Sequence, residues 1–142
     1  MKSSKIPFQD ILLGKVYEIK VTVTQDLIQS FAKVSGDFNP LHVNKTFAGN
    51  TPFKKNVAHG MLLGSFFSQI IGMLCPGENS LYLSQSLQFK NPVLEGDTVV
   101  VRGTVLDKNE SVQVVTFKTE ILNQNKVAVT GEAKVKVMDY GS

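Results

Sequence analysis

The chain has 142 residues, which suffice for one domain with its own core and leave little room for a second. Hydrophobic residues make up 42% and charged residues 19% of the sequence, so a disordered or fibrous chain is excluded. The formal net charge is +3, yet the lysines are scattered and Arg102 is the only arginine, so we expect no nucleic-acid partner.

The first elements are predicted to be a strand, a helix and an irregular segment. Val16–Thr24 alternates and is rich in β-branched residues, which is typical of a strand. Thr24 is the expected N-cap of a helix that runs to Ser35–Gly36, because apolar residues then recur every three or four positions. Residues 37–57 carry few periodic signals. An irregular segment of this length is uncommon in a compact domain unless it has a function.

The next element is a helix over Gly60–Leu74, which is apolar on almost every side and is therefore expected to be buried on most sides. Pro76–Gly77 should stop it. It is shorter than the ~18 to 20 apolar residues that span a bilayer, so we expect no membrane association. Cys75 is the only cysteine, which excludes an intrachain disulfide and suits the core of a cytoplasmic protein.

The second half of the chain is predicted to be a series of strands that are separated by turn signals. Short connections favour antiparallel pairing of these strands. A buried helix followed by a twisted antiparallel sheet makes a single α+β domain over residues 1–142, in which the sheet wraps the helix. The expected strands are Tyr82–Phe89, Thr98–Leu106, Val112–Leu122 and Val127–Val137.

Asp37 and His42 are the strongest candidates for chemistry. They lie five residues apart in the segment Gly-Asp-Phe-Asn-Pro-Leu-His, where Pro40 stiffens a turn. Such a pair could hold one water from two sides and move protons to and from it. An ordinary Asx-type turn, in which Asp37 and Asn39 bond nearby backbone groups, accounts for the same residues. Spacing alone leaves both interpretations open.

His59–Gly60 is the second feature, because it lies where the irregular segment becomes the apolar helix. The first N–H groups of a helix lack intrahelical partners and carry the positive end of its dipole, so this terminus could polarise a carbonyl oxygen. Simple N-terminal capping is the alternative. Ser65 and Ser68 lie inside the helix and could bond back to a carbonyl one turn earlier, or one of them could instead reach the Asp37 loop.

Other chemistry has no comparable support in the sequence. There is no Gly-rich phosphate loop and no CxxC or HExxH signature. With one cysteine and two histidines we expect no metal site. A nucleophilic pair of Cys75 with His59 is opposed by the ~20 Å of helix between them.

The stretch from Phe31 to His42, followed after five residues by Ala48, resembles the hydratase-2 motif of MaoC-like dehydratases and (R)-specific enoyl-CoA hydratases. Ala58-His59-Gly60 resembles a second motif of that family, and residues 10–138 match its single hot-dog layout. The resemblance therefore implies a hot-dog fold and a hydro-lyase that adds water reversibly to a trans-2-enoyl-CoA and forms the (R)-3-hydroxyacyl-CoA.

The resemblance also implies a role for each candidate residue. Asp37 and His42 would be catalytic and would activate the water, while Asn39 orders their loop and Ser65 supports Asp37. His59 and the Gly60 amide would bind substrate, the amide by holding the thioester oxygen. No metal and no cofactor would be needed, because coenzyme A arrives as part of the substrate.

The implied partners are an acyl-CoA or acyl carrier protein substrate and a second copy of the chain, in a homodimer whose sheets join edge to edge. Relatives often carry a glycine after the aromatic residue of Phe53-Lys54-Lys55-Asn56. We expect Lys54 and Lys55 to lie near the mouth of the tunnel that holds the acyl chain and to favour the phosphates of coenzyme A or of an acyl carrier protein. The alternatives are a (3R)-hydroxyacyl carrier-protein dehydratase, a hot-dog thioesterase and a non-catalytic acyl-thioester-binding module. Polyester precursor supply, fatty acid synthesis and fatty acid breakdown all remain open as pathways.

Overall fold

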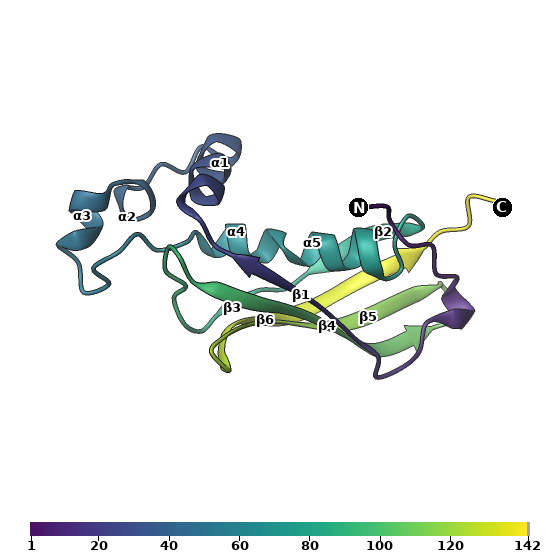
Figure 1. The fold of residues 1–142 in the computed structure, drawn as a ribbon. Coiled ribbons are helices and arrows are strands. Elements are labelled where there is room, and N and C mark those ends of the chain that lie inside the picture. Colours follow the sequence, from purple (N-terminus) through teal and green to yellow (C-terminus); the bar gives the residue numbers. More distant parts are fainter. Residues whose placement is uncertain (142) are drawn as a thin grey trace.

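The computed structural model, which describes residues 1–141, is an antiparallel sheet curved around a helical segment (Figure 1). The order along the sheet is β1-β4-β5-β6-β2, and the short β3 pairs with β6 beside β2. The expected α+β hot-dog architecture is therefore confirmed. The strands are β1 (Val16–Thr22), β2 (Ser80–Gln85), β3 (Gln88–Phe89), β4 (Thr98–Asn109), β5 (Val114–Asn123) and β6 (Lys126–Val137).

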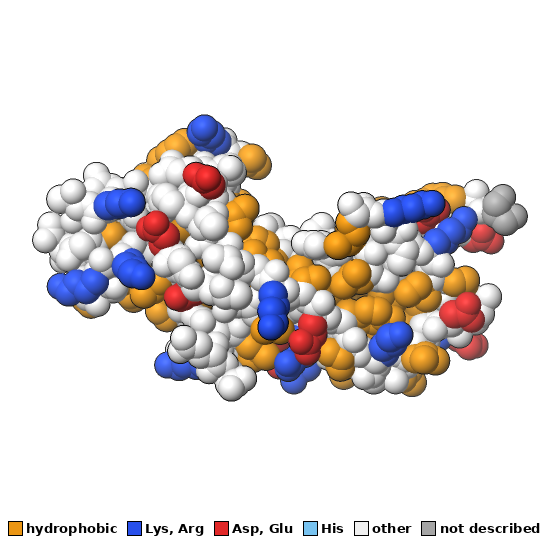
Figure 2. All heavy atoms as spheres, viewed as in Figure 1, with side chains coloured by type: hydrophobic (Ala, Val, Ile, Leu, Met, Phe, Trp, Pro, Cys, Tyr) orange, Lys and Arg blue, Asp and Glu red, His pale blue; other side chains and the backbone are white. Residues whose placement is uncertain are grey.

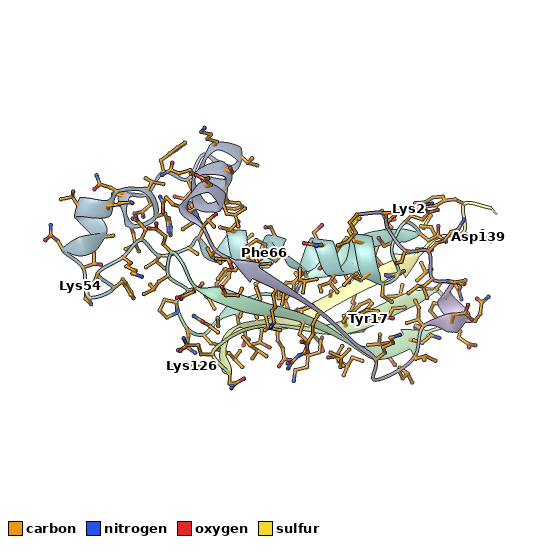
Figure 3. All side chains as sticks on the ribbon, viewed as in Figure 1. Lys2, Tyr17, Lys54, Phe66, Lys126 and Asp139 are labelled. Carbon is orange, nitrogen blue, oxygen red and sulfur yellow. The ribbon has the colours of Figure 1, made fainter. Side chains whose placement is uncertain are left out.

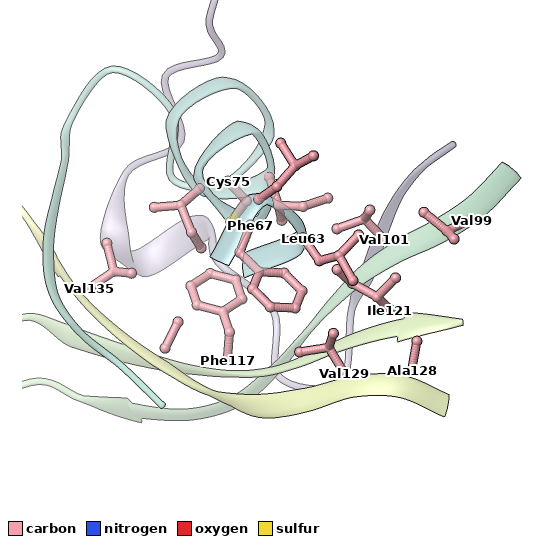
Figure 4. Packing of buried hydrophobic residues seen from close by; sticks show 14 of the residues in the cluster. Leu63, Phe67, Cys75, Val99, Val101, Phe117, Ile121, Ala128, Val129 and Val135 are labelled. Carbon is pink, nitrogen blue, oxygen red and sulfur yellow. The ribbon is translucent and has the colours of Figure 1, made fainter. Parts of the chain in front are cut away.

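Burial alternates along β4, so every second side chain of this strand faces the helical segment. The core lies between these side chains and the helix, with the rings of Phe67 and Phe117 at its centre (Figure 4). Both aromatic residues are fully buried. Each contributes the large apolar area that dominates core energetics.

The helical segment after residue 59 is broken, which corrects the expectation of one continuous helix. It consists of α4 (Gly60–Ser65), α5 (Phe67–Gln69) and a π-helical turn, η2 (Ile70–Leu74). Its inner side supplies core residues, but Met61 is 59% exposed and Ser65 and Ser68 are exposed as well. One side of this segment therefore faces outward, and it is not buried on most sides.

The segment expected to be irregular contains two short helices, α2 (Pro40–Val43) and α3 (Lys45–Gly49). Each begins at an asparagine whose side chain caps the helix: Asn39 accepts from Leu41 N–H, and Asn44 accepts from Phe47 N–H. Such helices are too short to show a hydrophobic period. With α1 (Gln25–Ser35) they form a lobe that projects beyond one end of the sheet (Figure 1).

The strand expected at Tyr82–Phe89 is split into β2 and β3. Between them the carbonyl of Ser86 crosses Gly131 of β6 so closely that no Cβ would fit at residue 131. The other strands are where the sequence predicts them, within a few residues. The turn Gln124–Asn125 has both residues at positive φ, as a two-residue hairpin requires.

The short 3-10 helix η1 (Phe8–Asp10) precedes β1. Among residues 1–141 there is no helix long and apolar enough to cross a membrane.

Candidate active site

The loop after α1 presents the Asp37 carboxylate. The helix ends at Gly36, which has a φ of 80°, and the Ser35 hydroxyl then accepts a bond from Asp37 N–H at 3.2 Å. Asp37 Oδ1 accepts the N–H of Asn39 at 3.1 Å, which is the Asx turn anticipated from the sequence. This bond leaves the second carboxylate oxygen, Oδ2, free to face another group. The turn and the catalytic interpretation are therefore compatible.

That other group is His42, whose Nε2 lies 3.9 Å from Asp37 Oδ2. His42 is on α2, which Asn39 caps and Pro40 opens. A separation of 3.9 Å is too long for a direct hydrogen bond, but it allows both atoms to contact the same water. The His42 side chain is 14% exposed and that of Asp37 is 51% exposed.

The opposite nitrogen of His42 fixes its tautomer. His42 Nδ1 lies 2.5 Å from the carbonyl oxygen of Val57. Because a carbonyl can only accept, Nδ1 carries the hydrogen, and in the neutral ring Nε2 is then an acceptor. Two acceptors, Nε2 of His42 and Oδ2 of Asp37, therefore face each other across a gap of one water.

His59 contacts both members of the pair, Asp37 and His42. Its ring is 2% exposed, stacks on His42 with centroids 3.9 Å apart, and meets the ring of Phe31 edge-on at 4.9 Å. Its Nε2 donates to the backbone carbonyl of Asp37 at 2.9 Å. The buried ring thus ties the Asp37 loop to the start of α4. This placement favours a positioning role, and the expected contact of His59 with substrate stays a prediction.

Gly60 is the first residue of α4 and lies beside His42 in a cavity of about 440 Å³. A Cβ at residue 60 would lie 2.8 Å from the ring of Phe89, so this ring would have to shift to admit any other residue. As the first helical residue, Gly60 has an N–H without an intrahelical acceptor. The other lining residues are Val57, Ala58, Met61, Leu63, Phe89, Lys90, Asn91, Pro92 and Val93.

Of the two remaining candidates, Asn39 lies where it was expected and Ser65 is bonded to another group. Asn39 orders the loop, as expected, through its cap of α2. Ser65 instead donates to the carbonyl of Leu62 at 2.6 Å, and within residues 1–141 no hydrogen bond joins it to Asp37. It lines a second apolar hollow together with Phe31, Met61 and Ser68. Support of Asp37 by Ser65 therefore stays a prediction.

Several residues of the site could not be assigned to it from the sequence. Phe89 and residues 90–93 line the cavity although they follow the apolar helix by some 15 residues in the chain. The Val57 carbonyl that selects the tautomer of His42 is a backbone atom, which no side-chain pattern can reveal. Only the Asn91-Pro92 turn signal marks this stretch, and it does not indicate what the turn approaches.

Asp37, His42 and His59 each offer a ligand atom, and these atoms lie within 4.8 Å of one another. In the present arrangement, one nitrogen of each histidine is already bonded to a carbonyl oxygen. The absence of a metal that the sequence led us to expect stays a prediction, which retention of activity after dialysis against a chelator would test.

Comparison with known proteins places the chain in a family. The sequence model of the protein family described as MaoC-like domain matches residues 11–127, which include the Asp37 loop, His59 and the start of α4. The chain belongs to the MaoC-like family. The expected family is therefore confirmed.

Two relatives of this MaoC-like chain are (R)-specific enoyl-CoA hydratases. The one from Rhodospirillum rubrum is 42% identical over 134 residues, which cover 94% of this chain and 93% of the relative. The one from Aeromonas caviae is 46% identical over 111 residues, which cover 78% and 83% of the two chains. The structure of an unliganded R-hydratase from Pseudomonas aeruginosa superposes with a TM-score of 0.92 and 36% identity, covering 96% of this chain and 88% of that one.

Proposed function

We propose that this chain is an (R)-specific enoyl-CoA hydratase, which adds water reversibly to a trans-2-enoyl-CoA. The observation that carries the proposal is the facing pair of acceptors, Asp37 Oδ2 and His42 Nε2, 3.9 Å apart next to the Gly60 cavity. The names of the relatives at 42% and 46% identity support the same reaction. No cofactor is proposed, because coenzyme A enters as part of the substrate.

The two acceptors bind one water, which donates a hydrogen to each of them and turns its oxygen toward C3 of the enoyl chain. The oxygen bonds to C3, the π electrons of C2–C3 move toward the thioester, and one acceptor takes the proton of the water. The same proton then returns to C2. Because Asp37 and His42 lie on one side of the substrate, both additions occur on the same face.

The thioester oxygen gains charge as the water adds. The N–H of Gly60 stands at the positive end of α4, which is worth roughly half a charge, and it can hold this oxygen as an enolate forms. His59 contributes by fixing the position of Asp37 relative to this helix end. A water-holding pair and an electrophile-binding helix end thus meet at one cavity.

We also propose a homodimer in the cytoplasm. Strand β2 is an edge of the sheet, and its side chains Leu81 and Leu83 are about half exposed. An apolar open edge of this kind needs a partner, and a second copy of the same strand is the simplest one. A monomer by light scattering would contradict it, and Leu83→Glu should produce a monomer if it is right.

The alternative within the same chemistry is a (3R)-hydroxyacyl carrier-protein dehydratase, which is less supported because the relatives described above carry hydratase names. A thioesterase needs a nucleophile or water aimed at the carbonyl carbon, whereas the pair proposed here serves C2 and C3. A non-catalytic binding module would not need two free acceptors.

The test is turnover of crotonyl-CoA and of the crotonyl thioester of an acyl carrier protein, with chiral analysis of the product. We expect (R)-3-hydroxybutyryl-CoA, no free thiol, and a kcat/KM at least tenfold higher for the coenzyme A substrate. Release of free thiol would indicate a thioesterase. Preference for the carrier-protein substrate would favour the dehydratase, and binding without turnover would favour a binding module.

A further inference from the structure

Strand β6 pairs with both β3 and β2, and the two residues between β2 and β3 belong to neither strand. The pairing of Gln85 with Ala133 and of Gln88 with Thr130 keeps one register across this gap. Strand β6 begins at Lys126, at the end of the sheet nearest the lobe (Figure 3), so β3 is the part of this edge that lies at the active-site end. The gap is not a slip of register, and it needs a local cause.

The cause lies at one peptide group, between Ser86 and Leu87. The N–H of Ser86 still donates to the carbonyl of Glu132 at 2.9 Å, as in a regular ladder. The N–H of Glu132, however, donates at 2.9 Å to the hydroxyl of Ser86 and not to its carbonyl. This carbonyl is turned instead toward Gly131, where a Cβ would not fit. The ladder is therefore interrupted by a turned carbonyl at Ser86.

The side chain of Gln85 holds the turned carbonyl. Because a carbonyl can only accept, the nitrogen of the Gln85 carboxamide must face it, and Nε2 donates to the Ser86 oxygen at 2.8 Å. The same nitrogen donates to Oγ1 of Thr119 at 2.9 Å, and Oε1 accepts from the hydroxyl of Tyr82. Both donors and the acceptor of this carboxamide are thus in use, which allows it only one orientation.

Thr119 connects this carboxamide to the core. It is 1% exposed, on the inner side of β5. Its partners on the neighbouring strands are Gly103 and Gly131, neither of which has a side chain. A hydroxyl buried among apolar groups is costly unless it is hydrogen-bonded, and Gln85 supplies that bond. The turned carbonyl is therefore held from inside the molecule.

Beyond the turned carbonyl, two side chains pack against glycines of α4. A Cβ at Gly64 would lie 2.8 Å from Leu87, and one at Gly60 would lie 2.8 Å from Phe89. The two glycines are about one helical turn apart, and the two side chains are two residues apart, on one face of the chain. The position of the backbone at residues 86–87 thus determines where the ring of Phe89 meets the start of α4.

The ring of Phe89 is part of the wall of the Gly60 cavity, which His42 also lines. Phe89 is 52% exposed. The lobe does not close over the helical segment, and Figure 2 shows the surface hollowed between them, with hydrophobic side chains exposed there. Packing covers only part of the ring, so its place depends on the backbone that carries it.

We propose that Gln85 is a positioning residue of the active site. By bonding the turned carbonyl of Ser86 to Thr119, it sets the place of the Phe89 ring and with it the shape of the Gly60 cavity. The inference rests on the proposed function, because its effect is read as a rate of hydration. A wall displaced by about 1 Å loosens the fit of the reacting thioester, and displacements of this size lower rates strongly.

The test is a double-mutant cycle of Gln85→Met and Phe89→Ala, with kcat and KM measured for crotonyl-CoA. Methionine keeps the length of the glutamine side chain and removes its donors. We expect kcat of Gln85→Met to fall about tenfold with KM within about twofold of wild type. Phe89→Ala should also lose kcat, and adding Gln85→Met to it should cause no further loss, because the ring is already absent. Gln88→Met, the matched control on the exposed face of β3, should keep the wild-type kcat.

Thr119 offers a second test, because it does not line the cavity. Thr119→Val removes the acceptor for Gln85 and should lower kcat about threefold, by roughly as much as one hydrogen bond contributes. Thr119→Ser keeps the hydroxyl and should retain most of kcat. Equal kcat values of the two variants would contradict the connection through Thr119.

An equal factor of loss on Gln85→Met in the wild-type and Phe89→Ala backgrounds would overturn the inference, since Gln85 would then act without Phe89. A rise in KM with kcat unchanged would overturn it in favour of direct contact with substrate, because Gln85 also lines the hollow beside Ser65. If wild type does not hydrate crotonyl-CoA, the proposed function fails, and crystal structures decide. A Phe89 ring displaced from Gly60 in Gln85→Met but not in Gln88→Met would support the inference, and a ring in place in both would overturn it.

Discussion

The sheet with its helix and the segment of residues 36–59 are held together in different ways. In the sheet, neighbouring strands share long ladders and the core contains many mutually packed apolar side chains, so each position is supported by several others. In residues 36–59, individual hydrogen bonds fix the groups of the site: one side-chain cap for each of α2 and α3, one carbonyl for His42 and one for His59. Changes in the first region should therefore affect stability, and changes in the second should affect rate.

The largest effect on stability is expected at the centre of the core. Phe117→Ala removes a fully buried ring and should lower the free energy of unfolding by about 3–5 kcal/mol. Phe117→Leu, the matched control, should cost less than half of that loss because it refills most of the space. Urea denaturation measures both. A fall of kcat in the folded fraction of Phe117→Ala would contradict the division between the two regions.

His59 should show the converse pattern. His59→Phe keeps a ring between His42 and Phe31 but loses the donor to the Asp37 carbonyl, so kcat should fall about tenfold with KM little changed, since a displaced catalytic group loses rate. His59→Gln restores an N–H donor and should recover part of kcat. A rise in KM with kcat unchanged would instead support direct contact of His59 with substrate.

Ser65 is expected to matter little. Its hydroxyl is bonded to the Leu62 carbonyl, so Ser65→Ala should change kcat by less than about twofold and the Tm by no more than ~2 °C. Steady-state kinetics with crotonyl-CoA decides this. A tenfold loss would show that Ser65 supports Asp37, as the family resemblance implies.

A pH dependence of stability is expected outside the active site. Burial raises the pKa of Tyr82 from 10.0 to about 12. The folded state then holds this proton more tightly than the unfolded state, so the stabilisation is present below pH 10 and is lost as pH rises through 10 to about 12. Tyr82→Phe should flatten the decline of Tm in this window. An unchanged slope would mean that Tyr82 does not contribute to it.

The sequence predicts the sheet and α1 well because burial imposes a period on the apolar residues, and this period can be seen in their order along the chain. Thr24 indeed caps α1, with its hydroxyl oxygen accepting from Leu27 N–H. The helices α2 and α3 are too short to show such a period, and each begins at a single asparagine cap. The break between β2 and β3 depends on contact with Gly131, which is distant in sequence.

The candidate site divides in the same way. Asp37 and His42 are close in sequence and their turn signals are local, so their proximity could be predicted. The positioning of His59 and the tautomer of His42 depend on contacts between segments that are distant in sequence. No local pattern carries that information.

The pair Asp37 and His42 is tested most directly by the kcat for crotonyl-CoA hydration in Asp37→Asn and His42→Ala, measured beside the Kd of each variant for the product. We expect kcat to fall by about 10³-fold in each variant, with Kd within a few-fold of wild type, because each removes one of the two acceptors that hold the water. A kcat within tenfold of wild type in either variant would contradict this account.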